Sequence, residues 1–237
     1  MSKKVLSPKG RKSLPQELQN FGVHLVYSEG TKTEPNYVKN IKNLIAQKYN
    51  CSPNDINIIP VSKESYNTIG LVKYAIDDTI KRAKNTHIDH VWIFFDKDDF
   101  PQDYFDSAIN QIDILNDSEN DNGDSFKYNK DTGISFHACY SNEAFELFLI
   151  QYFNYCDSIL NRKNYIEKLD SILKSNGKPK YDKSCDKLHD LLTSCGGKIE
   201  NAIKNSKKLT KNNNRSNPST TVYLFAEYFL PYMKKDM

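Results

Sequence analysis

The chain has 237 residues, of which 38% are hydrophobic and 27% charged, and its formal net charge is +3. This length allows one substantial core with an added elaboration, and 15 Tyr and 12 Phe supply large apolar side chains for it, which excludes a disordered protein. No apolar run approaches the roughly 18 residues of a membrane span, and the N-terminus lacks a secretory signal, so we expect a cytoplasmic protein without membrane insertion. The five cysteines are scattered and never form a C-x-x-C pair, which argues against a disulfide framework or a zinc ribbon.

The first hundred residues are predicted to alternate strands with helices. Apolar runs rich in β-branched residues indicate strands at residues 22–28, 56–61 and 90–95. The helix after the first strand is expected to use Thr33 as its cap and to carry Pro35 in its first turn. The helix after the second strand has apolar residues at spacings of three and four, namely Ile69, Val72, Ile76, Ile80 and Ala83. Crossovers of this length join parallel strands, so we expect an α/β fold with a mostly parallel, Rossmann-like sheet flanked by helices.

Beyond residue 100 the chain is predicted to add one strand and then become helical. Pro101 is expected to open a helix capped by Asp99 or Phe100, and residues 116–132 are so polar that we predict a long loop. The alternating segment 134–140 indicates a strand. Further helices are expected at residues 143–155, 158–175, 183–207 and 218–234. We therefore divide the chain into a basic flexible arm at 1–20, an α/β domain at 21–150 and a helical C-terminal region at 151–237 that packs on it.

Carboxylates follow two of the predicted strands. Asp96, Asp98 and Asp99 come directly after the apolar segment 91–95, and Glu29 follows the first strand. In open α/β sheets the ligand crevice lies outside the carboxyl ends of the strands, and Mg²⁺ prefers oxygen ligands. A turn through Asp96 and Asp98 presents both side chains to one site, whereas Asp99 is expected to cap the next helix. The sequence thus predicts that Glu29, Asp96 and Asp98 hold Mg²⁺ or Mn²⁺; the alternative is a solvated acidic loop.

Three more glutamates lie near predicted strand ends. Glu34 opens the first helix, where the helix dipole alone favours an acid, and its functional interpretation is a ligand of a second metal or of the outer shell. Glu143 and Glu146 follow the last predicted strand and, being three residues apart, are expected to share a helix face. A capping box on Ser141 or Asn142 is the alternative explanation for at least one of them.

Two segments are strongly basic. Residues 1–12 carry five Lys and Arg and no acid, and residues 198–215 set one acid, Glu200, against six cations: Lys198, Lys204, Lys207, Lys208, Lys211 and Arg215. Such segments are suited to neutralising phosphates, so we expect nucleic acid as a partner; the alternative is a solvated arm and a solvated helix face. Residues 217–220 are expected to cap the last helix.

Several other chemistries are excluded by missing motifs. The chain has no G-x-x-x-x-G-K-[ST] sequence, so it does not bind ATP through a P-loop, and it has no G-x-S-x-G nucleophile elbow. The pairs His87 with His90 and His137 with Cys139 lack further ligands at zinc-finger spacing.

Four segments in a fixed order carry a family resemblance: residues 27–37 (YSEGTKTEPNY), 91–100 (VWIFFDKDDF), 141–149 (SNEAFELFL) and 217–222 (NPSTTV). They resemble the successive motifs of the RloB-like proteins, a Toprim-related group that includes the second component of the AbiL abortive-infection system. The Glu-Gly and Asp-x-Asp pair also resembles the Toprim fold of topoisomerases, primases and OLD-type nucleases. The resemblance runs from about residue 20 to 234, and Asn142-Glu143 stands where the family pattern has Asn-Pro.

This resemblance implies a Toprim-like sheet with a helical C-terminal elaboration and Mg²⁺-dependent cleavage of DNA or RNA in anti-phage defence. It implies Glu29 as a ligand or acid/base group, Asp96 and Asp98 as metal ligands, and Glu146 as a further carboxylate. Relatives are commonly encoded beside an AAA-type or ABC-type ATPase, so such a partner is expected. The alternatives are a non-catalytic Toprim-like adaptor that binds nucleic acid or the ATPase, and a haloacid-dehalogenase-like phosphatase that uses Asp96. The sequence leaves the oligomeric state open, a homo-oligomer included.

Overall fold

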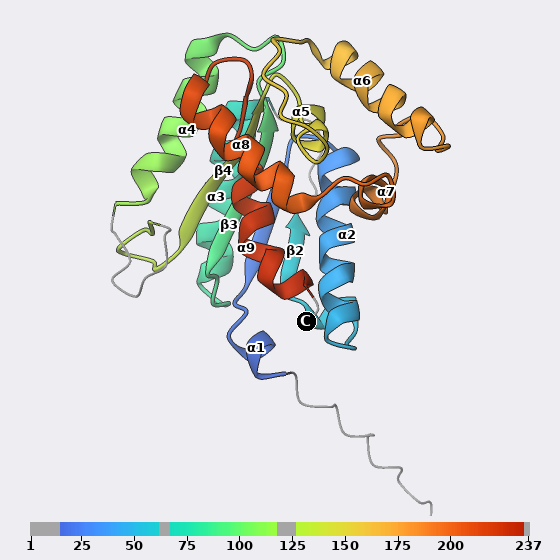
Figure 1. Cartoon of the computed structure of the whole chain (residues 1–237). Coiled ribbons are helices and arrows are strands. Elements are labelled where there is room, and N and C mark those ends of the chain that lie inside the picture. Colours follow the sequence, from blue (N-terminus) through green and yellow to red (C-terminus); the bar gives the residue numbers. More distant parts are fainter. Residues whose placement is uncertain (1–14, 62–66, 118–126, 235–237) are drawn as a thin grey trace, which may run out of the picture.

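One sheet organises the molecule. The computed structural model describes residues 15–61, 67–117 and 127–234, and within them five strands form a sheet in the order β2-β1-β3-β4-β5 (Figure 1). Strands β1 to β4 pair in parallel, and β5 pairs antiparallel with β4. The predicted α/β class with a mostly parallel, Rossmann-like sheet is therefore confirmed. The strands are β1 (His24–Ser28), β2 (Ile58–Val61), β3 (His90–Asp96), β4 (Ser135–Asn142) and β5 (Ser219–Thr220).

The strand order contains a point at which the chain reverses its direction across the sheet. From β1 the chain moves to one side to form β2, and it then returns to the other side of β1 to form β3. The register places Ser28 opposite Phe94, so the carboxyl ends of β1 and β3 lie side by side. In sheets of this kind the crevice at such a switch point is where ligands bind.

Helices cover both faces of the sheet. One face packs its side chains, such as Trp92 and Phe94, against α2 and α9, and the other packs residues such as Ile93 and Phe95 against α3 and α4. All seven residues of β3 are buried, as its uninterrupted apolar run predicts for a central strand. The helices are α1 (Gln16–Gln19), α2 (Thr33–Lys48), the 3₁₀ turn η1 (Pro53–Asp55), α3 (Thr68–Ala83), α4 (Gln102–Leu115), α5 (Glu146–Ile150), α6 (Arg162–Ser175), α7 (Leu188–Ser194), α8 (Ile199–Asn213) and α9 (Tyr223–Met233).

The first two crossover helices differ from the prediction in detail. Lys32 rather than Thr33 occupies the cap position of α2, and the Thr33 hydroxyl shares a hydrogen bond of 3.4 Å with the Tyr181 hydroxyl instead. Helix α3 is rotated relative to the predicted apolar stripe: it buries Leu71, Val72 and Ala75, and Ile80 is 48% exposed. The buried stripe runs through Leu71, Ala75 and Thr79, and Ile80 lies about 100° further round the helix from Thr79, so it falls outside this stripe.

The C-terminal region differs most from the prediction. The helix expected at 183–207 is interrupted at Gly196 and Gly197, because Gly196 adopts a φ of +85° and a Cβ on Gly197 would lie 2.9 Å from the carbonyl oxygen of Leu192. The helix expected at 143–155 is only the five-residue α5. Residues 217–220 do not cap a helix, since Ser219 and Thr220 extend the sheet as β5 and α9 begins only at Tyr223.

The predicted arm and loop lie partly outside the described residues. Residues 1–14 of the arm and 118–126 of the loop are among those that the structure does not describe. Within the arm, α1 is helical rather than flexible and buries Leu18 in the core. Among the described residues, none of the helices combines the length and apolar character needed to cross a bilayer.

Candidate functional site

The backbone brings the predicted acidic side chains to one edge of the sheet. Glu29 follows β1 directly, and its backbone N–H donates to the carbonyl of Phe94 at 3.0 Å. Asp96 is the last residue of β3. Glu29, Asp96 and Asp98 all line one hollow of about 240 Å³ at the switch point. The sequence prediction that these three carboxylates meet at one rim of the sheet therefore agrees with the geometry.

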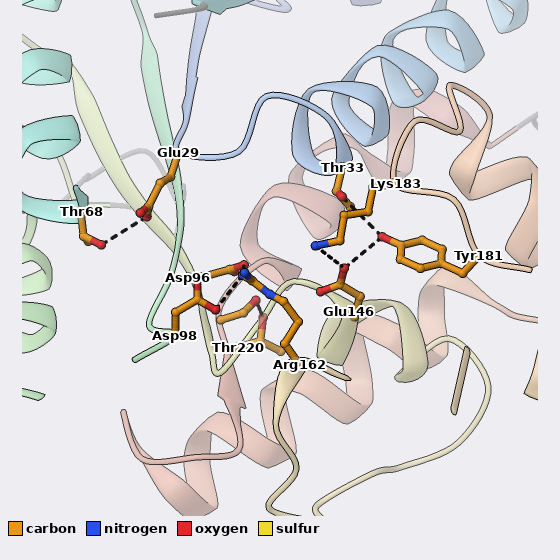
Figure 2. A network of polar contacts seen from close by, with 11 residues as sticks. Glu29, Thr33, Thr68, Asp96, Asp98, Glu146, Arg162, Tyr181, Lys183 and Thr220 are labelled. Atoms are coloured by element: carbon orange, nitrogen blue, oxygen red, sulfur yellow. Dashed lines mark hydrogen bonds and ion pairs between the residues drawn. The ribbon is translucent and has the colours of Figure 1, made fainter. Parts of the chain in front are cut away.

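The turn after β3 aims two aspartates in the same direction. Its backbone is held by β4 and the residues after it, since the Lys97 N–H donates to Ser141 at 2.9 Å and the Asp98 N–H donates to Glu143 at 3.1 Å. Asp98 has a φ of +44°, a left-handed conformation that Asp tolerates better than most residues. As a result, Asp96 and Asp98 both face the guanidinium of Arg162 (Figure 2).

Glu29 points to a different side of the hollow. Its carboxylate accepts a hydrogen bond of 3.2 Å from the Thr68 hydroxyl at the start of α3 (Figure 2). Burial raises the pKa of Glu29 to about 7, and the charges of Asp98 and Glu34 add to the increase. Glu29 is thus poised between its charged and neutral forms near neutral pH.

Two further glutamates lie deeper in the same site. Residues Glu34, Asp96 and Glu146 are 7%, 8% and 1% exposed, respectively. Burial and then the charge of Glu146 raise the pKa of Glu34, and burial and then the charge of Glu34 raise the pKa of Asp96. In this buried cluster the charge of Glu146 therefore disfavours the ionisation of both Glu34 and Asp96.

Gly30 makes room for Glu34. A Cβ at residue 30 would collide with the Glu34 carboxylate, which folds back from the first turn of α2 over the loop after β1. The helix dipole alone does not explain this placement, because an acid that served only the dipole would remain solvated. A side chain at residue 30 would therefore force the Glu34 carboxylate to move from its present position.

Basic and hydroxyl groups from the C-terminal region complete the site. Arg162 bonds Asp96 at 2.6 Å and Asp98 at 2.8 Å. The Lys183 ammonium lies 3.4 Å from Glu146, to which the Tyr181 hydroxyl also donates at 3.3 Å (Figure 2). The sequence prediction did not include Arg162, Tyr181 or Lys183. A cation at the first position of a helix opposes the helix dipole, so Arg162 at the start of α6 was the one available signal of an acidic partner.

The predicted roles of Glu143 and Asp99 require correction. Glu143 precedes α5, which begins at Glu146, so the two glutamates do not share a helix face. Ser141 and Asn142 belong to β4 and form no capping box. Asp99 does not cap α4, because the Phe100 N–H donates to the Lys97 carbonyl and leaves Pro101 at the cap position. Glu143 and Asp99 instead line a second hollow of about 630 Å³, which shares three residues with the first: Glu29, Asp98 and Arg162.

The basic residues predicted to contact nucleic acid lie elsewhere. None of Lys198, Lys204, Lys207, Lys208, Lys211 and Arg215 lines the acidic hollow. Lys207 pairs with Glu227 at 2.5 Å, and Lys208 stands 4.3 Å from the centre of the Tyr155 ring. Arg215 joins the end of α8 to α4, through Asp113 at 3.0 Å and Asn110 at 2.7 Å. Arg215 therefore has a structural role, and the lysines of α8 remain on an outer face.

The donor set suits a hard divalent cation, although its present arrangement is built around a cation of the protein itself. All the acidic groups offer oxygen ligands, which Mg²⁺ and Mn²⁺ prefer. Within the described residues, no group of three or more His, Cys, Asp or Glu side chains stands in an arrangement that holds a metal ion. The Nε of Arg162 is buried without a hydrogen-bond partner, so the guanidinium satisfies the carboxylates while remaining incompletely satisfied itself. The oxygen donors of the site thus suit Mg²⁺ or Mn²⁺ in kind, whereas their present positions are set by Arg162.

Comparison with known proteins identifies the family. A family model described as "RloB-like protein" matches residues 24–228. This span begins at the first residue of β1 and ends within α9, so it includes the whole sheet and every residue of the acidic hollow. Comparisons with curated proteins and with solved structures give no match. Because the model covers most of the chain, the resemblance found in the sequence is confirmed: the protein belongs to the RloB-like family.

Proposed function

We propose that this protein is a divalent-metal-dependent nuclease that cleaves phosphodiester bonds in DNA or RNA. The observation that supports the proposal is the convergence of Glu29, Asp96 and Asp98 on one hollow at the switch point of the sheet. Buried like charges are costly, and a fold retains such a cluster most readily where a bound cation or a substrate offsets the cost.

Asp96, Asp98 and Glu29 are the residues that would hold Mg²⁺ or Mn²⁺. Glu34 and Glu146 are available to a second ion or to the outer shell of the first. When bound, such an ion polarises the scissile phosphate and lowers the pKa of an attacking water.

The protein's own groups supply proton transfer and charge. Glu29 has an alternative role as the acid/base group when Asp96 and Asp98 hold the ion without it: in the metal-free protein burial raises its pKa to about 7, which suits it to accept a proton from water near neutral pH. Lys183 and Arg162 bring positive charge to the rim of the same hollow, where it would stabilise the charge that develops on a phosphate. Tyr181 keeps Glu146 in place through its hydroxyl.

A cleavage assay with substitutions tests the proposal. Purified protein is incubated with single- and double-stranded DNA and RNA in Mg²⁺ or Mn²⁺, and the products are resolved on a denaturing gel. We expect Asp96→Asn to lower the rate on the order of 10²- to 10³-fold, the range seen when a group that stabilises transition-state charge is removed. Glu29→Gln is expected to act in the same direction.

Asp103→Asn is the matched control. Asp103 is an exposed acid in the first turn of α4 that lines neither hollow, so its removal changes the net charge equally and leaves the site intact. Cleavage that persists unchanged in Asp96→Asn would show that the carboxylate cluster is not the active site.

A second candidate function is a non-catalytic adaptor that binds nucleic acid or an ATPase. One observation favours it: Arg162 occupies the position between Asp96 and Asp98, as in a structural ion pair. Binding of nucleic acid without cleavage, in either metal and with an ATPase partner present, would support the adaptor.

The biological setting is also a proposal, and it rests on the family resemblance alone. We propose a role in anti-phage defence together with an AAA-type or ABC-type ATPase partner. Co-purification of a tagged chain with the product of a neighbouring ATPase gene, and a phage challenge of cells that carry Asp96→Asn, would test the two parts separately.

A further inference from the structure

The site consists of two hollows with Arg162 between them. The inner hollow, of about 240 Å³, contains the buried carboxylates Glu34, Asp96 and Glu146. The outer hollow, of about 630 Å³, is lined by Phe100, Glu143, Asn161 and Lys163 among others. Glu29, Asp98 and Arg162 line both. A movement of the Arg162 side chain alone would therefore change which charged groups line each hollow.

The bonds that hold Arg162 are charged but not geometrically complete. A single nitrogen, Nη2, bonds both Asp96 and Asp98, at 2.6 Å and 2.8 Å. This is not the paired fork in which two guanidinium nitrogens meet two oxygens of one carboxylate. The Nε is buried and has no hydrogen-bond partner, and the side chain is 35% exposed. The site thus neutralises the charge of Arg162, but it leaves one hydrogen-bond donor of the guanidinium group unsatisfied.

The carboxylates need a positive charge, and two cations cannot share them. Glu34, Asp96 and Glu146 are buried together, so without a neighbouring cation their repulsion would be uncompensated. A divalent ion bound to Asp96 and Asp98 would stand where the guanidinium now stands and would repel it. The two cations are therefore alternatives at the same oxygens.

Resting on the nuclease function proposed above, we propose that Arg162 is an internal counter-ion that exchanges with the divalent cation and, once displaced into the outer hollow, binds a phosphodiester oxygen of the substrate. Arg162 is the first residue of α6, and the Asn161 side chain caps that helix by accepting from the Asn164 N–H at 3.0 Å. The helix start is thereby fixed, and only the flexible side chain has to turn. Lys163 lies beside the outer hollow and adds a second positive charge to it.

The exchange predicts opposite effects on metal binding and on cleavage. In Arg162→Ala the cation no longer competes with the protein's own charge, so Mn²⁺, followed by electron paramagnetic resonance, should bind about tenfold more tightly than to the wild type. In the presence of a chelator the same variant should melt roughly 5 °C lower, because the carboxylates have lost their counter-ion, and saturating Mn²⁺ should restore the loss. Cleavage at saturating Mn²⁺ should nevertheless decrease, because the phosphate contact is absent.

Two variants separate this role from a merely structural one. Arg162→Lys keeps the charge without the guanidinium, so it should recover the melting temperature in chelator and bring the Mn²⁺ affinity back toward that of the wild type. Lys174→Ala removes an exposed cation from the last turn of the same helix and should change neither quantity.

The outcomes distinguish the exchange from the nuclease function. Cleavage by the wild type with equal or weaker Mn²⁺ binding in Arg162→Ala overturns the exchange and leaves the nuclease standing. Tighter Mn²⁺ binding in Arg162→Ala without cleavage by any form supports the exchange and overturns the nuclease. If neither the wild type nor Arg162→Ala binds Mn²⁺, both proposals fall.

Discussion

The two ends of the sheet use polar residues in opposite ways. Near the N-terminal ends of the strands, His24, His90 and His137 lie in one buried row with Trp92. The Trp92 N–H donates to the His24 Nδ1 at 3.3 Å, and His90 and His137 share a hydrogen bond of 3.0 Å. Aromatic side chains of α9 pack against the row. Burial lowers the pKa of His24 to about 3 and also lowers the pKa of His137, so both imidazoles are neutral and hydrogen-bonded at neutral pH.

At the C-terminal ends of the same strands the buried groups are acids in contact with a cation. Glu34, Asp96 and Glu146 are as inaccessible as the histidines, but their charges are only partly compensated by Arg162 and Lys183. Polar groups that are neutral and fully bonded specify and stabilise a core, whereas clustered charges weaken it unless a ligand offsets them. The comparison thus supports the proposal that the histidine end stabilises the fold and that the acidic end binds a ligand.

The largest predicted effect on stability lies at the histidine end. Trp92 is fully buried among aromatic side chains, so Trp92→Ala should lower the free energy of unfolding by about 3–5 kcal/mol through the lost contacts and the cavity left behind. Urea denaturation followed by circular dichroism measures the change. The cleavage rate per folded molecule should decrease far less than in Asp96→Asn. An equal decrease would contradict the proposal that the histidine end serves stability and the acidic end serves ligand binding.

At the acidic end, Gly30→Ala should lower the free energy of unfolding by roughly 1–3 kcal/mol, as overpacking does. The added methyl group collides with the Glu34 carboxylate. The double variant Gly30→Ala with Glu34→Ala should recover most of this loss, because the colliding group is gone, while cleavage stays reduced. Lack of recovery would mean that residue 30 needs glycine for its backbone and not for the space beside Glu34.

The sequence was sufficient to predict the four parallel strands and the acids that follow β1 and β3. The apolar run 91–95 followed by Asp96 and Asp98 defines a buried strand and its end, and the crossover lengths place Glu29 at the same edge. Both predictions rest on patterns within short stretches of consecutive residues. The RloB-like motifs added the family, which the comparison confirms.

The partners of these acids could not be predicted in the same way. Arg162 and Lys183 lie 66 and 37 residues from the acids they contact, and no periodicity links them. Long-range contacts of this kind depend on how the C-terminal helices pack, where the sequence analysis was least accurate. Tertiary packing determines both the interruption of the helix at Gly196 and Gly197 and the formation of the two-residue strand β5. It outweighs the helical propensity of the flanking residues.

The two ends should also respond oppositely to pH when metal is removed by a chelator. Burial raises the pKa of Glu29 from 4.5 to about 7, so its contribution to stability is full below pH 4.5 and is lost as the pH rises to 7. Burial lowers the pKa of His24 from 6.5 to about 3, so its contribution is full above pH 6.5 and is lost as the pH falls toward 3. At about 1.4 kcal/mol per pKa unit, each change should be on the order of a few kcal/mol, and smaller for the partly exposed Glu29 than for the fully buried His24.

Substitution at each end identifies its share of the pH dependence. In Glu29→Gln the loss of stability between pH 4.5 and 7 should shrink, and in His24→Asn the loss below pH 6.5 should shrink, as measured by urea denaturation across the pH range. If Glu29→Gln leaves the upper interval unchanged, the carboxylate is already solvated in the folded protein, and the contrast between the ends is weaker than the structure indicates.

The smallest predicted effect concerns the outer face of α8, which belongs to neither end. Lys208 lies over the Tyr155 ring on an exposed surface, so Lys208→Ala should change the free energy of unfolding by less than about 0.5 kcal/mol. If this face binds a nucleic-acid backbone, the slope of log affinity against log salt concentration should decrease by about 0.7–0.9, the value of one phosphate contact. Lys81→Ala, an exposed cation on α3 across the sheet, is the control and should leave the slope unchanged. An unchanged slope in Lys208→Ala as well would mean that this lysine contacts no phosphate, and would favour the two hollows as the place where the strand is bound.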